Sequence, residues 1–202
     1  MSRIAAIILA AGQASRFRAA AGEAGPETKL VAHFEGRPLV RHVAEAAIAS
    51  RAAPVIAVTG HAEEAVRGAL KGLPLAFAHN PDYATGIASS LRRGLAEVPP
   101  DCDGALVLLG DMPLVSAEII NALISAFEAS PQTKAVAPLR DRQRGNPVLL
   151  SRALFPAVAK VKGDVGAKVL LAQAQGAVLD VPVASPAVSF DVDTPDALAS
   201  KD

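Results

Sequence analysis

Cysteine is almost absent from this sequence: Cys102 is the single one among 202 residues. A lone cysteine cannot form an internal disulfide, so the cysteine content is compatible with a reducing compartment. Long apolar runs are absent as well, and none approaches the ~20 residues of a membrane-spanning helix. The apolar segment Ile4–Ala11 lacks a basic stretch in front and is followed by arginines, which argues against a signal peptide. We therefore expect a cytoplasmic protein without membrane contact.

An excess of charge of either sign is also missing. Twenty basic and twenty acidic residues give a formal net charge of +0. No block of lysine and arginine interleaved with aromatic residues is present, so we expect no nucleic-acid partner. Because the field of the whole molecule is weak, any bound anion must be held by a local cluster of residues. The length fits a single domain, residues 1–202, which buries roughly 70% of its unfolded surface.

Two kinds of segment alternate along the chain. Short apolar runs bounded by turn residues predict buried strands at Ile4–Leu9, Val55–Thr59, Leu75–Ala78, Ala105–Leu109, Ala135–Ala137 and Val148–Leu150. Apolar residues at helical spacing predict helices at Val40–Ser50, Ala62–Leu70, Ile87–Val98, Ala117–Ala129 and Val165–Gln173. This alternation predicts an α/β fold in which helices cover a mostly parallel sheet. Ligands of such sheets bind outside the carboxyl ends of the strands, so the junctions after the strands are the candidate sites.

The first strand leads into a loop that begins with Leu9, Ala10, Ala11 and Gly12. Small residues let a ligand approach the backbone closely, and consecutive amides in such a turn bind anions. Arg16 adds a planar fork of donors and Lys29 a point charge, the two kinds of cation that phosphate sites use. The alternative is an ordinary strand–helix turn with solvated charges. The loop matches neither G-x-G-x-x-G nor G-x-x-x-x-G-K-[ST], so neither the dinucleotide fingerprint nor the P-loop applies.

An aspartate directly follows the most apolar strand. In the stretch Ala105–Val115, five apolar residues precede Gly110 and Asp111. A carboxylate at this position is costly unless a cation or hydrogen-bond donors compensate it. Asp111 is therefore a candidate for contact with a cation, and capping of the following turn is the alternative.

A second pair of acidic residues lies near the C-terminus. Asp191 and Asp193 are two positions apart in an extended segment, which points both carboxylates to the same side. Two such charges repel each other unless a cation joins them. The residues Thr194–Asp196 are typical of a helix start, but this does not explain Asp193. Zinc is not expected, because the four histidines are far apart in the sequence and the cysteine has no partner.

The stretch Asn80–Leu95 combines an Asn-Pro turn, a glycine and two serines that open a helix. Amide groups and hydroxyls at a helix N-terminus can hydrogen-bond a base edge or a phosphate. Plain N-capping by Ser89 or Ser90 is the alternative.

In order from Ile7 to Leu198, these motifs resemble those of the MobA-like nucleotidyltransferases, and among them the molybdenum cofactor cytidylyltransferases. The similarity rests on "LAAGQASRF" followed by Lys29, on the G-D-x-P form of Gly110–Pro113 and on the serine-bearing stretch. It implies a three-layer Rossmann-like nucleotidyltransferase fold with a mostly parallel mixed sheet. It also implies roles for Arg16 and Lys29 on the triphosphate, for Gly86 and Ser90 at the nucleobase, and for Asp111 and Asp193 as ligands of Mg²⁺. Magnesium suits such a pair, since waters and substrate phosphates fill the rest of its octahedron.

The resemblance extends to the acceptor side. The stretches "RQRGNPVLL" and "KGDVGAKVLL" match the cytidylyltransferase pattern, which places Arg144, Asn146 and Asp164 at the acceptor substrate. Taken by themselves, the first stretch could be a turn and the second a helix entry.

The N-terminal loop departs from the family pattern. Arg18 follows Phe17 where the family has a glycine, and residues 19–28 form an insertion. Gly22 or Gly25 would serve in place of the missing glycine. We expect the alanine-rich stretch, residues 19–25, to be mobile.

The function that the resemblance implies is transfer of CMP from CTP to the phosphate of molybdopterin or of the molybdenum cofactor, with release of pyrophosphate. Arg16, Lys29 and Asp111 would carry catalysis by holding the reactants in line and neutralising charge. An acceptor phosphate is already ionised, which fits the lack of a recognisable Ser–His–Asp set. The "LAAG" form, in place of "LAGG", favours CTP over GTP.

Other functions stay open at this point. The same fold could serve a GTP-using guanylyltransferase or a sugar-phosphate nucleotidyltransferase. A non-catalytic carrier of the molybdenum cofactor is the alternative from another class, and the pair Asp111 and Asp193 argues against it. A molybdoenzyme or its chaperone is a further possible partner.

Overall fold

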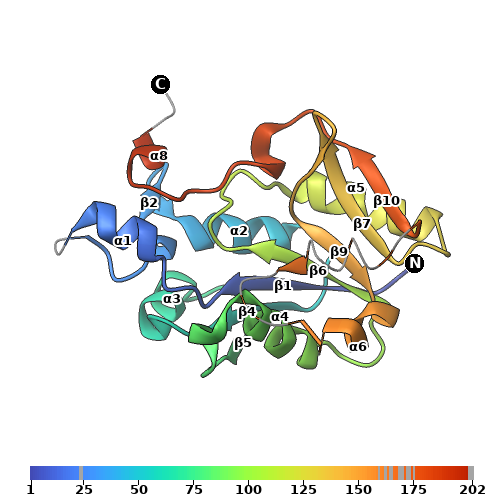
Figure 1. Ribbon diagram of the computed structural model, residues 1–202, viewed down its shortest axis with the longest axis horizontal. Coiled ribbons are helices and arrows are strands. Elements are labelled where there is room, and N and C mark those ends of the chain that lie inside the picture. Colours follow the sequence, from blue (N-terminus) through green and yellow to red (C-terminus); the bar gives the residue numbers. More distant parts are fainter. Residues whose placement is uncertain are drawn as a thin grey trace.

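The computed structural model describes residues 1–22, 25–158, 160–161, 163, 166–167, 171, 174 and 176–199, and of Arg16 and Ala199 it describes only the backbone. These residues form three layers, in which one sheet lies between two layers of helices (Figure 1).

The central sheet has eight strands. Their order is β10-β7-β9-β6-β1-β4-β5, and β8 pairs with β7. The strands are β1 (Ile4–Ala10), β4 (Val55–Thr59), β5 (Ala76–His79), β6 (Gly104–Leu109), β7 (Ala135–Arg140), β8 (Gln143–Arg144), β9 (Val148–Ser151) and β10 (Val178–Pro182). β1 pairs in parallel with β4 and β6, and the pairs β4–β5 and β7–β10 are also parallel. Because β9 runs antiparallel to both β6 and β7, the sheet is mixed, and the prediction of an α/β fold with a mostly parallel mixed sheet is confirmed.

Strand β1 lies inside the sheet and is apolar on both faces. All seven of its residues are buried, as expected of a parallel strand that helices cover on both sides. Ala5, Ile7 and Leu9 pack in one core with α4 (Ile87–Ala96) and α6 (Phe155–Val158). The alternate residues of β1 pack in a second core with α2 (Leu39–Ala49), α3 (Glu63–Ala69) and α5 (Ala117–Ala129). Figure 1 shows α2 and α5 on one side of β1 and α4 and α6 on the other.

Helix α5 has the bounds that its sequence predicts. Ser116 is its N-cap, and the Ser116 side chain accepts a hydrogen bond from the Ile119 backbone N–H at 3.5 Å. Glu118 lies in the first turn, where a negative charge interacts favourably with the helix dipole. Ile120, Leu123 and other apolar residues of one face fill the second core.

A third, smaller cluster joins the two ends of the chain. Phe17 of α1 (Ser15–Ala21) packs with Phe34 of the hairpin β2–β3 (His33–Phe34 and Arg37–Pro38) and with Val192. Val192 is fully buried, and α8 (Asp196–Ala199) follows it. The cluster therefore brings the C-terminal segment to the N-terminal loop. The described part of the chain also contains short 3-10 helices: η1 (Lys29–Val31), η2 (Tyr83–Thr85), η3 (Arg152–Leu154) and η4 (Pro186–Val188).

The structure contains several elements that the sequence did not predict: the short strands β2, β3 and β8, helix α6, and the two longer elements α1 and β10. Ser15–Ala21, predicted to be loop and, from residue 19, mobile, form helix α1, because Phe17 anchors it in the third cluster. Gly22, with φ at +69°, ends this helix by donating to the Arg18 carbonyl at 3.1 Å. The pattern also predicts no strand at β10, which pairs with β7 at the edge of the sheet. The helix predicted at Val165–Gln173 falls mostly outside the described residues.

None of the described helices has the length and apolarity that crossing a bilayer requires.

Candidate active site

The carboxyl ends of β1 and β6 lie side by side and place Asp111. The Gly110 N–H donates to the Leu9 carbonyl at 3.1 Å, and Asp111 follows at once. A Cβ at Gly110 would stand 3.1 Å from the same carbonyl oxygen and 3.2 Å from Leu30 Cδ2, so a glycine suits this close approach. Asp111 is thereby fixed at the sheet edge where a ligand of this fold class binds.

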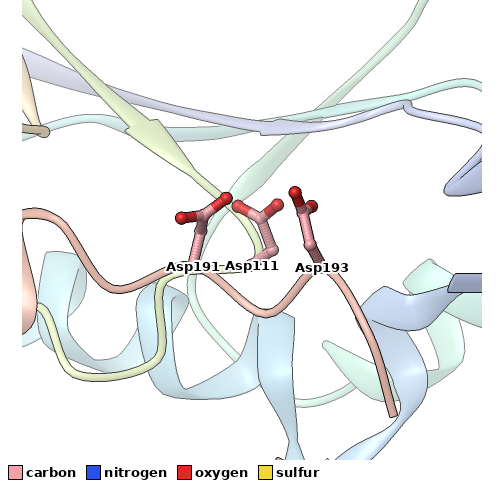
Figure 2. Close-up of side chains that lie close together, drawn as sticks. All are labelled: Asp111, Asp191 and Asp193. Carbon is pink, nitrogen blue, oxygen red and sulfur yellow. The ribbon is translucent and has the colours of Figure 1, made fainter. Parts of the chain in front are cut away.

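The C-terminal segment brings two more carboxylates to the same place. The backbone N–H of Val192 donates to the Asp111 carbonyl at 3.1 Å, and the Val192 side chain is buried in the third cluster. Carboxylate oxygens of Asp111, Asp191 and Asp193 lie within 4.8 Å of one another, and Figure 2 shows the three groups side by side. We call these three residues the acidic group.

Lys29 lies against two members of the acidic group. Its Nζ is 2.6 Å from Asp111 Oδ2 and 2.8 Å from Asp193 Oδ1. Lys29 opens η1, where the fully buried Thr28 caps the turn by accepting a hydrogen bond from the Leu30 N–H at 3.5 Å. Burial by itself would lower the pKa of the Lys29 ammonium, but the adjoining carboxylates outweigh burial and raise that pKa. Lys29 is therefore a fixed positive charge beside the acidic group.

Asp191 differs from its neighbours in its electrostatic surroundings. Loss of water around its carboxyl raises the pKa of Asp191, and the negative charges of Asp193 and Asp111 raise it further. Clustered carboxylates of this kind lower their mutual repulsion by binding a cation. Three carboxylate donors are the ligand set of a hard divalent ion such as Mg²⁺ or Mn²⁺. Within the described part of the chain, the acidic group is the only cluster of three such ligands, and it contains no histidine.

A cleft of about 380 Å³ opens beside the acidic group. We call it the donor cleft, after the nucleotide-binding role that the sequence resemblance predicts for its residues. Its lining includes Leu9, Ala11, Gly12, Lys29, Gly86, Ser90, Tyr83, Asp111 and Asp193. The structure thus gathers nearly all residues that the sequence predicts for the nucleotide. Ala10 is the exception, since it is fully buried and does not line the cleft, and the side chain of Arg16 lies outside what the structure describes.

Gly86 and Ser90, at the start of α4, form one wall of the donor cleft. Gly86 has φ at +108°, a conformation that L side chains rarely adopt, which explains a glycine there. Ser90 is buried in the first turn of α4, and its hydroxyl accepts a hydrogen bond from the Asn80 side chain at 3.0 Å. The prediction did not include Asn80, because an Asn-Pro pair is already explained as a turn.

A second cleft, of about 710 Å³, adjoins the first. We call it the acceptor cleft, after the role that the sequence resemblance predicts for Arg144 and Asn146. It shares Leu9, Ile87 and Leu109 with the donor cleft. Asp191 lines this second cleft, whereas Asp111 and Asp193 line the first. The acidic group therefore stands between the two clefts.

Two of the three residues predicted for the acceptor line this cleft. Arg144 is bound by Asp180 of β10 through two contacts, Nε to Oδ1 at 2.6 Å and Nη2 to Oδ2 at 3.0 Å, and this pairing raises the pKa of the guanidinium. Asn146 is held by its backbone N–H, which donates to the Val188 carbonyl at 2.8 Å. The third, Asp164, lies outside the described residues. Arg140, which the prediction missed, also lines the cleft.

The family model that matches this chain assigns it to the class of nucleotidyltransferases. The chain belongs to the family described as the MobA-like NTP transferase domain, whose model matches residues 6–178.

Two curated proteins are similar to this chain in sequence. The chain is 28% identical over 148 residues to the bifunctional protein GlmU of Legionella pneumophila (strain Lens), which covers 73% of this chain and 30% of that protein. The chain thus spans less than a third of the length of this relative. It is also 29% identical over 196 residues to nicotine blue oxidoreductase of Paenarthrobacter nicotinovorans, which covers 95% of this chain and 92% of that protein.

Solved structures share the fold over almost the whole chain. Rv0371c from Mycobacterium tuberculosis H37Rv has a TM-score of 0.83 at 26% identity, covering 98% of this chain and 96% of that one. A complex of the same protein with manganese has a TM-score of 0.78 at 25% identity, covering 99% and 100%. CMP:2-keto-3-deoxy-manno-octonic acid synthetase complexed with CTP has a TM-score of 0.74 at 15% identity, covering 98% and 96%, and shows the fold alone.

Proposed function

We propose that this nucleotidyltransferase transfers CMP from CTP to the phosphate of molybdopterin or of the molybdenum cofactor and releases pyrophosphate, with Mg²⁺ as its cofactor. The observation that carries the proposal is the position of the acidic group between two adjoining clefts. A donor nucleotide in one cleft and an acceptor phosphate in the other would meet at these carboxylates.

The proposed roles follow from what each residue can offer. Asp111 and Asp193, with Asp191 beside them, would hold the divalent ion. A bound divalent ion would supply charge neutralisation on the triphosphate. Lys29, already at the edge of the donor cleft, would neutralise phosphate charge, and Arg16 is proposed for the same task.

Positioning is the main task left to the protein. Because the acceptor phosphate is ionised at neutral pH, no strong general base is required. Ala11 and Gly12, which follow β1, line the donor cleft, and their amides would bind phosphates that approach the backbone. The fixed end of β6 and the walls of both clefts would hold the acceptor oxygen in line with the α-phosphorus.

The choice of CTP and of a molybdopterin acceptor rests on the sequence resemblance and on two structural features. Gly86 and Ser90 lie in the wall of the donor cleft, where a nucleobase would sit. Arg144 and Asn146 line the acceptor cleft, and Arg144 would have to leave Asp180 in order to contact an acceptor phosphate. A GTP-using or sugar-phosphate enzyme of the same fold is the nearest alternative.

Pyrophosphate release tests donor and acceptor together. The enzyme is incubated with CTP, GTP, ATP or UTP and Mg²⁺, with and without molybdopterin. We expect release only with CTP and molybdopterin together, and we expect Asp111→Asn to abolish it. Asp101→Asn is the matched control. Asp101 is an exposed carboxylate that pairs with Arg3, and these residues precede the N-terminal ends of β6 and β1, away from the acidic group. Release with GTP in place of CTP would contradict the proposed donor, and full activity of Asp111→Asn would contradict the metal assignment.

An oxidoreductase is the second candidate, because the relative from Paenarthrobacter nicotinovorans carries that name and matches 95% of this chain. Oxidation of a reduced nicotinamide nucleotide without pyrophosphate release would favour it. Tight binding of molybdopterin without any turnover would instead favour a cofactor carrier.

A further inference from the structure

The buried side chain of Asn80 holds both serines that open α4. Asn80 is 3% exposed, and its backbone N–H donates to the Thr59 carbonyl at 2.8 Å. Its Nδ2 donates to Ser89 Oγ at 2.9 Å and to Ser90 Oγ at 3.0 Å. The amide orientation is set by Oδ1, which accepts from the Asp82 N–H at 3.1 Å, since a flipped amide would place two donors against each other. Asn80 is therefore a hydrogen-bond donor toward Ser90.

The two serines differ in where their own protons point. Ser89 Oγ donates within the loop, with the carbonyls of Gly86 at 2.8 Å and Asp82 at 3.0 Å as acceptors. Ser90 is 4% exposed and lines the donor cleft. Among the residues that the structure describes, none accepts the Ser90 hydroxyl proton. A buried hydroxyl proton without an acceptor is unfavourable, so a ligand in the cleft gains by supplying one.

We propose that Asn80 is a positioning residue for base selection: its amide donates to one lone pair of the Ser90 oxygen and cannot accept the Ser90 proton, which is therefore left for the nucleotide and favours a base with an acceptor at that point. This inference rests on the proposed function, in which Ser90 faces the nucleobase. Cytosine has an unprotonated N3, whereas uracil carries a proton there. CTP satisfies the Ser90 proton at this position and UTP does not. Asn80 itself does not line the cleft, so it acts through Ser90.

The substitution Asn80→Asp tests this polarity with almost no change in shape. The carboxylate oxygen that replaces Nδ2 accepts the Ser90 proton, and the Ser90 lone pairs then face the nucleotide. We expect the preference for CTP over UTP, measured as the ratio of their dissociation constants by calorimetry with Mg²⁺, to fall by about tenfold. The added negative charge weakens both nucleotides alike and cancels in the ratio. A ratio equal to that of the wild type would overturn the proposal.

A double-mutant cycle separates positioning from a general structural effect. Ser90→Ala removes the hydroxyl, so Asn80→Asp should leave the ratio unchanged in that background. Ser89→Ala is the matched control, since the Ser89 proton stays within the loop, and it should keep the ratio of the wild type. An equal effect of Asn80→Asp with and without the Ser90 hydroxyl would overturn the proposal.

Two further measurements keep the result interpretable. If Asn80→Asp does not fold, the wild-type protein is tested with 3-deazacytidine triphosphate, which lacks the N3 acceptor. Binding about tenfold weaker than that of CTP supports the proposal, and equal binding overturns it.

If the wild type prefers purine nucleotides, the proposed donor is wrong. The cycle is then run with ATP and GTP, because N1 of adenine is unprotonated and N1 of guanine carries a proton. A shift of Asn80→Asp toward GTP then supports the role of Asn80, and no shift overturns it.

Discussion

The Nζ of Lys29 lies 2.6 Å from Oδ2 of Asp111, so the ammonium contacts a carboxylate that is proposed to bind a divalent ion. The same ammonium is 2.8 Å from Asp193 Oδ1. If the acidic group holds an ion as proposed, Lys29 would compete with that ion for these carboxylates. If these carboxylates hold an ion as proposed, Lys29 would be released toward the donor cleft, which it already lines.

The substitution Lys29→Met removes the competing charge. We expect it to tighten Mn²⁺ binding about fivefold or more, because the carboxylates lose their internal cation. Turnover should fall at the same time, since the triphosphate loses a positive charge. Electron paramagnetic resonance of free Mn²⁺ gives the affinity, and Lys71→Met, at an exposed lysine, serves as the control. Weaker or unchanged Mn²⁺ binding in Lys29→Met would refute the competition.

Helix glycines provide a test of how closely α4 packs on the sheet. A Cβ at Gly94 would stand 2.5 Å from Ile7 Cγ2 and 2.9 Å from Val58 Cγ2. Gly94→Ala should therefore lower the free energy of unfolding by about 1–3 kcal/mol through overpacking. Gly68 of α3 has open space around the same position, so Gly68→Ala should instead raise that free energy by about 0.5 kcal/mol. Urea denaturation of both variants measures the contrast, and a stabilising Gly94→Ala would show that α4 can move away from β1.

The ionised carboxylate of Glu63 makes a contribution to the free energy of unfolding that depends on pH. Hydrogen bonding from Arg67 and from Thr59, together with the charge of His79, holds the pKa of Glu63 below its ordinary value of 4.5. A lowered pKa in the folded state means that the ionised carboxylate contributes stability above pH about 4.5, and that this contribution is lost as the pH falls through the folded-state value.

Glu63→Gln is therefore expected to be less stable than the wild type at pH 7 and to approach it below pH 4. Thermal unfolding across this pH range measures the difference. Glu64→Gln, at the exposed neighbouring position, should show a smaller change with pH. A constant difference between wild type and Glu63→Gln from pH 7 to pH 3 would mean that the carboxylate charge plays no part.

The sequence allowed most strands and helices to be predicted because their signals are local. Val55–Thr59 and Ala117–Ala129 have the predicted bounds, since an apolar run between turn residues and a helical period with an N-cap are both complete within a few residues. Strand β10 was missed because it is defined by pairing with a strand that is distant in the sequence. Its Val178 pairs with Ala135 of β7. Helix α1 was missed because its anchor, Phe17, depends on a cluster that includes the far end of the chain.

In the candidate site, too, features with a local sequence signal could be predicted, and contacts between distant residues could not. Asp111 could be singled out because a carboxylate directly after an apolar strand needs a compensating partner. Asp191 and Asp193 could be singled out because two carboxylates on the same side of an extended segment repel each other. The contact of Lys29 with both carboxylates could not be predicted, because it joins residues that are remote in the sequence. The pairing of Arg144 with Asp180 was hidden for the same reason, since it depends on the edge strand β10.

Diffraction from crystals soaked in Mn²⁺ tests the central claim most directly. We expect an anomalous difference peak within roughly 2.5 Å of carboxylate oxygens from both Asp111 and Asp193, with the Lys29 ammonium moved away from them. The peak should vanish in Asp111→Asn. No peak at this position under saturating Mn²⁺, with Lys29 still bound to both carboxylates, would contradict the account.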